Sequence, residues 1–288
     1  MKQDILSPDF FDRYQVTQKE KISSTPTGLP TLNRICRDDG GGGGFAFGWF
    51  VTIAGNPGFG KSALALNVAS AVLDHGTSVG YISLEMSPQQ LATRLYALHT
   101  NTRIALLERG GFTQLVWDDA RKEMSGSPPL WVPTNILSTW QSVLEYCKSC
   151  YESGCRYFIL DYLQLVNTGD EDAIYRSTQR IVTELRAWAV QNQCTIVCLS
   201  QFNRSTSGNY DSTPRSQGLF GGMILEASSD LVLLLDHSRY ERSMNTAKTW
   251  LVVAKNRHGP TVDIPIQWDY RTLAVYEAAQ GQDSSWPK

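Results

Sequence analysis

One stretch of eight residues has types and spacing suited to binding phosphate. It fits G-x-x-x-x-G-K-[ST] and consists of Gly55, Asn56, Pro57, Gly58, Phe59, Gly60, Lys61 and Ser62. Glycines let main-chain N–H groups converge on phosphate oxygens, and a following helix N-terminus adds a positive end. We expect Lys61 to bridge the β- and γ-phosphates of a nucleoside triphosphate and Ser62 to ligate Mg²⁺. The apolar run 49–54 and the helical pattern 61–75 supply the context that this motif requires, which disfavours a chance glycine turn.

Two carboxylates that follow apolar runs complete the chemistry of a hydrolytic site. Asp161 ends the run 157–160, and Glu85 ends the run 81–84. In a parallel sheet both side chains emerge at the carboxyl edge, where ligands bind. We expect Asp161 to hold Mg²⁺ through water and Glu85 to be the base that activates water. From local pattern alone, a simple role for Glu85 as the cap of the next helix is equally open.

The elements that must position these residues alternate between strand and helix patterns. Strand patterns also occur at 79–84, 130–132, 195–199, 230–235, 250–254 and 262–268, and helical patterns at 88–99, 104–125, 139–153 and 173–192. Such alternation predicts an α/β fold with a mostly parallel central sheet flanked by helices. We expect residues 1–26 to form an N-terminal arm and residues 27–288 to form one domain.

The composition excludes several classes of protein. No apolar run reaches the roughly 20 residues that cross a bilayer, and the polar N-terminus is not a signal peptide. The chain therefore reads as cytoplasmic, with its six cysteines reduced. Cys147, Cys150 and Cys155 have no fourth ligand nearby and are interpreted as structural rather than zinc-binding. A net charge of -2 gives no bulk sign of nucleic-acid binding, so any such contact needs a few local basic residues or an assembled surface.

Four further segments resemble the core motifs of DnaB-type replicative helicases, which are ring-forming RecA-like NTPases of superfamily 4. They are SLEM at 83–86 followed by SPQQLATRL, DYLQL at 161–165, LSQFNR at 199–204 and KNRHG at 255–259. The resemblance runs from about Thr27 to Glu277 in matching order and rough spacing. It implies a RecA-like P-loop NTPase fold and an ATP-dependent DNA helicase motor that uses ATP or another NTP with Mg²⁺.

The resemblance also implies roles for single residues. Glu85 corresponds to the catalytic glutamate, Asp161 to the Mg²⁺-organising aspartate and Gln201 to the glutamine that senses the γ-phosphate. Lys255 and Arg257 correspond to a pair that reaches into the neighbouring subunit's site, with Arg257 as the arginine finger. A finger supplied by a neighbour can be worth about 10³–10⁵ in rate. An ordinary solvated basic turn is the alternative for this pair.

The Ser- and Gly-rich stretch 203–223 follows the glutamine strand and is the predicted contact for single-stranded DNA. Arginines and main-chain amides would bind phosphates, and an aromatic ring would pack on a sugar or base; the candidates are Arg204, Arg215, Phe220, Gly221 and Gly222. A surface loop without a ligand is the alternative. Part of this stretch is apolar where the family is commonly polar and basic, and its Gly-Gly-x-x-Leu pattern resembles a DNA loop of RecA-like recombinases.

The resemblance further implies a homo-oligomer, a hexamer with active sites between subunits, bound to single-stranded DNA and served by a replication loader or primase. Only about 26 residues precede the core, so we expect no helical collar and a linker-helix role for the arm, docked on the next subunit. Two rival functions follow from the same residues. One is a recombinase-like filament or DNA-remodelling ATPase, and the other is a nucleotide-switched, DNA-binding assembly module that unwinds nothing.

Overall fold

The computed structural model describes residues 24–36, 43–109, 125–135, 139–161, 171–201, 222–242 and 246–278, with the single positions 118, 122 and 137. Four DNA-contact candidates, Arg204, Arg215, Phe220 and Gly221, lie outside these residues. Residues 1–23 of the predicted arm and most of the predicted helix 104–125 also lie outside them.

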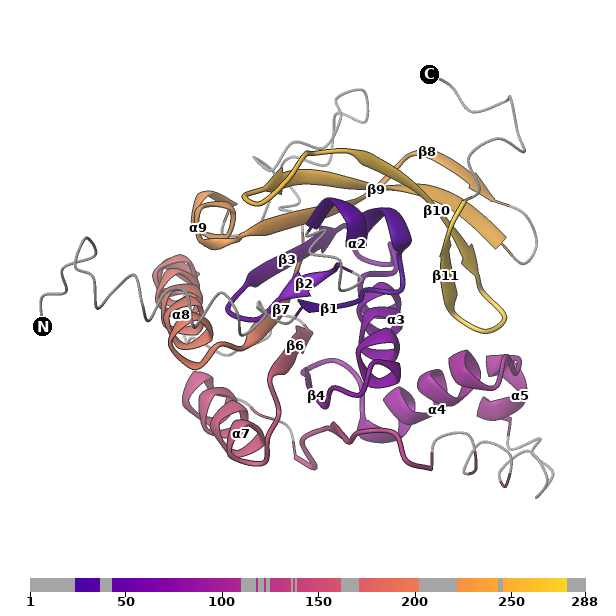
Figure 1. Ribbon diagram of the computed structural model, residues 1–288, viewed down its shortest axis with the longest axis horizontal. Coiled ribbons are helices and arrows are strands. Elements are labelled where there is room, and N and C mark those ends of the chain that lie inside the picture. Colours follow the sequence, from indigo (N-terminus) through magenta and orange to yellow (C-terminus); the bar gives the residue numbers. More distant parts are fainter. Residues whose placement is uncertain are drawn as a thin grey trace, which may run out of the picture.

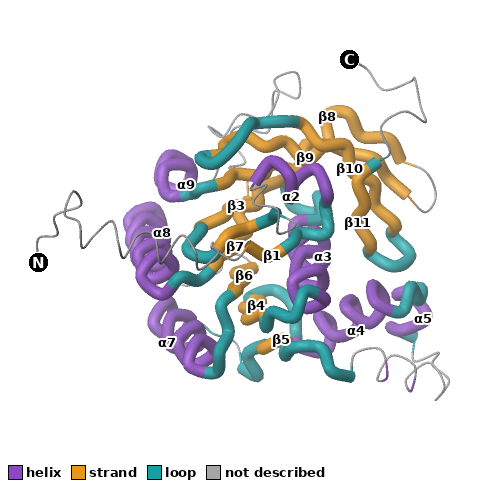
Figure 2. Tube along the Cα trace, in the orientation of Figure 1, coloured by secondary structure: helices purple, strands orange, loops and turns teal. Residues whose placement is uncertain are grey.

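A nine-stranded sheet forms the centre of the described structure (Figures 1 and 2). Its strands, in spatial order, are β11 (Ala274–Glu277), β10 (Asp263–Asp269), β9 (Thr246–Asn256), β8 (Leu231–Arg242), β3 (Phe50–Gly55), β7 (Thr195–Gln201), β6 (Tyr157–Asp161), β4 (Val79–Ser83) and β5 (Leu130–Trp131). The six strands from β8 to β5 pair in parallel, and β9, β10 and β11 add an antiparallel edge. The mostly parallel sheet predicted from the sequence is therefore confirmed.

Helices cover both faces of this sheet. Side chains of α2 (Pro30–Cys36), α3 (Lys61–Asp74) and α4 (Pro88–His99) pack into one apolar cluster, and α5 (Ile104–Glu108) follows α4. Side chains of α7 (Trp140–Glu152), α8 (Glu171–Asn192) and α9 (Gly222–Ser228) pack into a second cluster. Successive strand residues point to opposite faces, so Val51 joins the first cluster and Phe50 the second. Burial on both faces explains the continuous apolar runs of the parallel strands.

Strand β3 occupies the point where the strand order reverses. Its neighbours are β7 on one side and β8 on the other, and all six of its residues are buried. The following helix, α3, leads to β4, which lies three places away across β7 and β6. Open α/β sheets bind ligands beyond the carboxyl end of strands at such a switch point. The topology therefore predicts a ligand site at the residues after Gly55.

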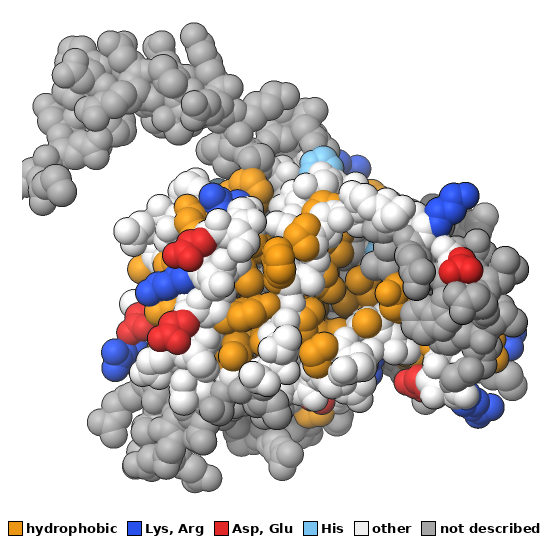
Figure 3. All heavy atoms as spheres, turned by 90° about the horizontal axis from the view of Figure 1, so that it is seen from below, with side chains coloured by type: hydrophobic (Ala, Val, Ile, Leu, Met, Phe, Trp, Pro, Cys, Tyr) orange, Lys and Arg blue, Asp and Glu red, His pale blue; other side chains and the backbone are white. Residues whose placement is uncertain are grey.

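Seen from below Figure 1, hydrophobic side chains gather across the middle of the face and most charged ones lie toward its sides (Figure 3). None of the helices in the described ranges is long and apolar enough to cross a membrane.

A residue near the C-terminal end of the described chain contacts the start of α2. The main-chain N–H groups of Thr31 and Leu32 donate to Oε1 of Glu277, at 2.7 and 3.4 Å. These donors belong to the first turn of the helix and have no partner within it. Glu277 therefore caps α2 from β11, more than 240 positions away in the sequence.

We expect Glu277→Ala to lower the free energy of unfolding by about 1 kcal/mol, as loss of a helix cap typically does. Glu277→Gln keeps an acceptor oxygen and should cost less. Urea unfolding followed by circular dichroism measures both variants. Equal losses in the two variants would show that the acceptor oxygen is not what stabilises α2.

Candidate active site

The phosphate-loop motif lies between β3 and α3, as its sequence predicts. Gly58 and Gly60 adopt left-handed backbone angles, with φ of 78° and 86°. Residues with a side chain rarely adopt such angles. A Cβ atom on Gly60 would also lie 2.8 Å from the ring of Trp268. Glycine is therefore required at position 60 by conformation and by packing together.

Lys61 is the buried cation of this loop. Its Nζ donates to the carbonyl oxygens of Gly55 and Asn56, each at 3.0 Å. Burial lowers the pKa of Lys61, and the nearby charges of Asp161 and Glu85 oppose that shift. The ammonium is thus held inside the loop that the motif assigns to phosphates.

Strand register brings the other predicted residues to the same edge. Gly55 pairs with Gln201 across β3 and β7, and Ser83 pairs with Asp161 across β4 and β6. Glu85 follows two residues after Ser83 and is exposed. A pocket is lined by the loop from Pro57 to Ala63 together with Glu85, Arg94, Gln201, Trp268, Asp269, Tyr270 and Leu273. Glu85 and Gln201 therefore face one space with the phosphate loop.

The cap alternative for Glu85 is not needed by α4. The helix begins with a capping box in which Ser87 accepts from the N–H of Gln90 at 3.2 Å. Oε1 of Gln90 accepts from the N–H of Ser87 at 2.9 Å. Because these two residues cap the helix reciprocally, Glu85 remains an exposed carboxylate on the pocket.

Asp161 is fully buried at the end of β6. Its Oδ2 accepts a hydrogen bond from the phenol of Tyr81 at 3.0 Å. Its Oδ1 is buried and has no hydrogen-bond partner among the described residues. Burial raises the pKa of Asp161, while hydrogen bonding to Ser62 and Tyr81 and the charge of Lys61 act in the opposite direction.

This pair of oxygen-bearing side chains fits a hard divalent cation. Asp161 offers a carboxylate oxygen without a partner among the described residues. The hydroxyl of Ser62 lies close enough to the Asp161 carboxylate to lower the pKa of Asp161. Mg²⁺ prefers such oxygen ligands, usually one or two from protein with the rest from water and substrate phosphates. Ser62 and Asp161 are therefore suited to the role that the sequence predicted for them.

Several residues of the site were not predicted from the sequence. Tyr81 is a core residue of β4, and Arg94 reaches the pocket from α4. Trp268 and Tyr270 arrive from β10 and the turn after it, about 200 positions after the phosphate loop. No local pattern marks these side chains, because their contribution depends on which strands and helices become neighbours.

Lys255 and Arg257 lie at the opposite end of the sheet from the phosphate loop. Asp230 and Phe50 pair through their main chains at the amino end of β3, and the N–H of Arg257 donates to the Asp230 carbonyl at 2.9 Å. The phosphate loop begins at the other end of β3, after Gly55. At about 3.3 Å per residue, these ends are roughly 16 Å apart. The two predicted halves of the site do not meet within one chain.

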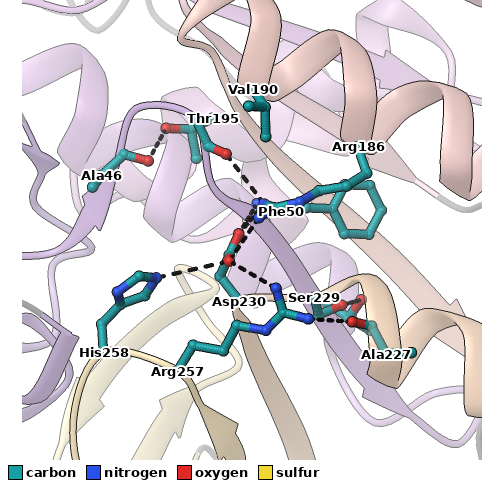
Figure 4. A network of polar contacts seen from close by, with 12 residues as sticks. Ala46, Phe50, Arg186, Val190, Thr195, Ala227, Ser229, Asp230, Arg257 and His258 are labelled. Carbon is teal, nitrogen blue, oxygen red and sulfur yellow. Dashed lines mark hydrogen bonds and ion pairs between the residues drawn. The ribbon is translucent and has the colours of Figure 1, made fainter. Parts of the chain in front are cut away.

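Figure 4 shows what the finger candidate contacts in its own chain. The Arg257 guanidinium donates to the carbonyl of Ala227 and lies 3.7 Å from Oδ1 of Asp230. Nζ of Lys255 donates to the carbonyl of Glu226 and lies 3.5 Å from that of Ala227. Both cations thus bind carbonyls near the C-terminal end of α9. The DNA-contact candidate Gly222 is the first residue of that helix.

Comparisons with known proteins identify the family of this chain. Residues 25–276 match the family described as "DnaB-like helicase C terminal domain". The chain is 29% identical over 229 residues to a "Probable plasmid replicative DNA helicase" of Chlamydia psittaci, covering 77% of this chain and 50% of that protein. It is 28% identical over 255 residues to "Replicative DNA helicase DnaB" of Leifsonia xyli subsp. xyli, covering 85% and 54%. The chain thus spans about half the length of these curated relatives.

A solved structure shows the same fold. The "ATPase Domain of G40P" superimposes with a TM-score of 0.80 at 22% identity, covering 97% of this chain and 100% of that one. The expected RecA-like architecture is therefore confirmed. Because the family match extends over most of the sequence, from before the phosphate loop to β11, this chain belongs to the DnaB-like helicase C-terminal domain family.

Proposed function

We propose that this chain is the motor domain of a DNA helicase, which hydrolyses ATP or another NTP and moves along single-stranded DNA. The observation that carries the proposal is the convergence of Lys61, Glu85, Asp161 and Gln201 on one sheet edge, in a member of a helicase family. Each of these four side chains has a distinct task in phosphoryl transfer to water.

The tasks follow from the surroundings of each side chain. Lys61 neutralises charge on the terminal phosphates from within the loop. Glu85 is exposed on the pocket, where it can orient water and accept its proton. Gln201 ends β7 beside Gly55 and lines the pocket, where it would contact the terminal phosphate. Ser62 and Asp161 would hold Mg²⁺, which when bound stabilises negative charge on the transferred group.

Lys61 and Arg94 line the pocket from the same chain, and a further positive group for the developing charge would come from another copy of the chain. Arg257 lies about a full strand length from its own phosphate loop. Its side chain is 42% exposed, so it is accessible to a neighbour. We therefore propose a hexamer in which Lys255 and Arg257 act on the nucleotide bound by the adjacent subunit. Single-stranded DNA would lie against the segment with Arg204, Arg215, Phe220, Gly221 and Gly222, which leads into α9.

The first test is hydrolysis and strand separation on a forked duplex. We expect single-stranded DNA to stimulate hydrolysis, and Glu85→Gln to lower the hydrolysis rate by about 10²–10⁴ while nucleotide binding persists. Glu152→Gln, which changes an exposed carboxylate at the end of α7, is the matched control and should keep activity. Stimulated hydrolysis without strand separation would favour the assembly module. Helical filaments in electron micrographs would favour the recombinase-like alternative.

The second test asks whether active sites are shared between subunits. Arg257→Ala and Lys61→Ala proteins should each be nearly inactive alone. Mixing them creates interfaces where an intact phosphate loop meets an intact finger, so hydrolysis should return. Mass photometry with a non-hydrolysable ATP analogue checks that each variant still assembles. Assembly of both variants with no recovered hydrolysis at any mixing ratio would contradict the shared site.

A further inference from the structure

A hydrogen bond joins Asp161, a motif residue, to Tyr81, which is not one of the motif residues. Tyr81 is fully buried on β4, and its phenol donates to Oδ2 of Asp161 at 3.0 Å. Its β4 neighbour Ser83 pairs directly with Asp161, and Tyr81 pairs with Ile159 two residues earlier on β6. The phenol therefore reaches along the face of the sheet to the end of the adjacent strand.

This bond determines which carboxylate oxygen is left for other partners. Oδ2 is occupied by the phenol, whereas Oδ1 is buried without a partner among the described residues. A carboxylate held at one oxygen cannot rotate freely, so the remaining oxygen keeps a fixed direction. Hydrogen bonds of this kind orient metal-organising side chains, and their loss typically costs about 10–100-fold in metal affinity.

We propose that Tyr81 is a positioning residue that fixes the Asp161 carboxylate for the Mg²⁺–nucleotide complex. The proposal rests on the Mg²⁺-organising function proposed above for Asp161. Tyr81 itself touches neither nucleotide nor metal and acts only through Asp161.

The test is the Mg²⁺ dependence of nucleotide binding in a background that cannot turn over. Full-length Glu85→Gln protein is titrated with Mg²⁺ in the presence of a fluorescent ATP analogue. Adding Tyr81→Phe should raise the Mg²⁺ concentration at half-saturation by about 10–100-fold. Binding of the analogue in EDTA should be unchanged, which also shows that the pocket is folded.

Tyr157 supplies a matched control. It is an equally buried tyrosine on β6, in the same apolar cluster as Tyr81, and its hydroxyl has no partner among the described residues. Tyr157→Phe should leave the Mg²⁺ midpoint unchanged. Equal midpoints for Tyr81→Phe and Tyr157→Phe would overturn the proposal. If Asp161→Asn also left the midpoint unchanged, the function proposed for Asp161 would fail instead.

Asp230 carries a second, independent inference. It is 2% exposed and receives donors from three parts of the fold (Figure 4). Its carboxylate accepts two hydrogen bonds from the Arg186 guanidinium on α8 and one from the N–H of Phe50 at 2.9 Å. Arg257 and His258 each lie 3.7 Å from its Oδ1.

The same residue also holds the main chain of the finger segment. The N–H of Arg257 donates to the Asp230 carbonyl, and the His258 ring stacks on Trp49 with centroids 4.4 Å apart. The backbone at Arg257 is thus tied to the core from both sides, while its guanidinium remains 42% exposed. A buried carboxylate already paired with Arg186 can orient a second cation without enclosing it.

We infer that Asp230, paired with Arg186, is the positioning residue for Arg257. This inference rests on the proposed action of Arg257 in the neighbouring subunit. The test therefore asks with which partner variant a mixed oligomer recovers hydrolysis. A general loss of stability would reduce recovery with every partner alike.

Asp230→Asn keeps an acceptor for Phe50 but removes the charge that orients Arg257. Mixed with Lys61→Ala, this variant should recover hydrolysis, since its intact loop meets an intact finger. Mixed with Arg257→Ala, it should recover little, because neither partner supplies a well-placed finger. Ser229→Ala is the control: it removes the buried hydroxyl that pairs with Thr52 at 2.8 Å and should not behave as a finger variant.

Two outcomes distinguish a failure of the role inferred for Asp230 from a failure of the shared active site. Equal recovery of Asp230→Asn with both partners would overturn a positioning role for Asp230. Failure of the reference mixture, Arg257→Ala with Lys61→Ala, would instead contradict the shared site on which the role depends.

Discussion

Strand β3 is the element on which the rest of the structure depends. It is buried on both faces and paired in parallel on both edges, so its direction and register are fixed. Its carboxyl end opens into the phosphate loop, and its amino end is tied to Asp230 and, through it, to Arg257. Strand β3 thus separates the phosphate loop from the arginine that is proposed to act with it. Under that proposal, the chemistry requires a second copy of the chain.

The two opposite edges of the parallel strands surround a buried carboxylate in opposite ways. Asp230 receives a charged guanidinium and a main-chain N–H, so its charge is compensated where it is buried. Asp161 receives a phenol on one oxygen and leaves the other unpartnered, and burial raises its pKa. Such an under-compensated group costs stability in the folded chain. It is expected where a cation completes the site, and unexpected where a residue only supports the fold.

The sequence predicted those parts of the site that depend on local order. Gly60, Lys61 and Asp161 follow buried strands, and parallel strands bring their carboxyl ends together, so their convergence follows from one topological rule. Tyr81 was not predicted, because in a strand pattern it reads as one more core residue. Its role arises from the register between β4 and β6, which no single segment encodes.

Other contacts of the fold could not be predicted from local sequence patterns either, because they join segments that are far apart in the sequence. The antiparallel edge of β9, β10 and β11 brings Trp268 over Gly60, a contact between segments about 200 positions apart. The capping of α2 by Glu277 spans almost the whole chain. Hydrophobic periodicity identifies elements of this kind but does not say which elements will be neighbours.

The contacts of Lys255 and Arg257 connect the proposed finger to the predicted DNA segment through one short helix. The last carbonyls of any helix lack partners within it, and basic side chains commonly satisfy them. In α9 these cations are the two proposed to act on a neighbour's phosphates. The helix begins at Gly222, where the predicted DNA segment ends. Any shift of α9 moves the acceptors that hold the pair, and any movement of the pair removes partners from α9. If binding at one location shifts α9, linkage requires that affinity at the two locations change by the same factor.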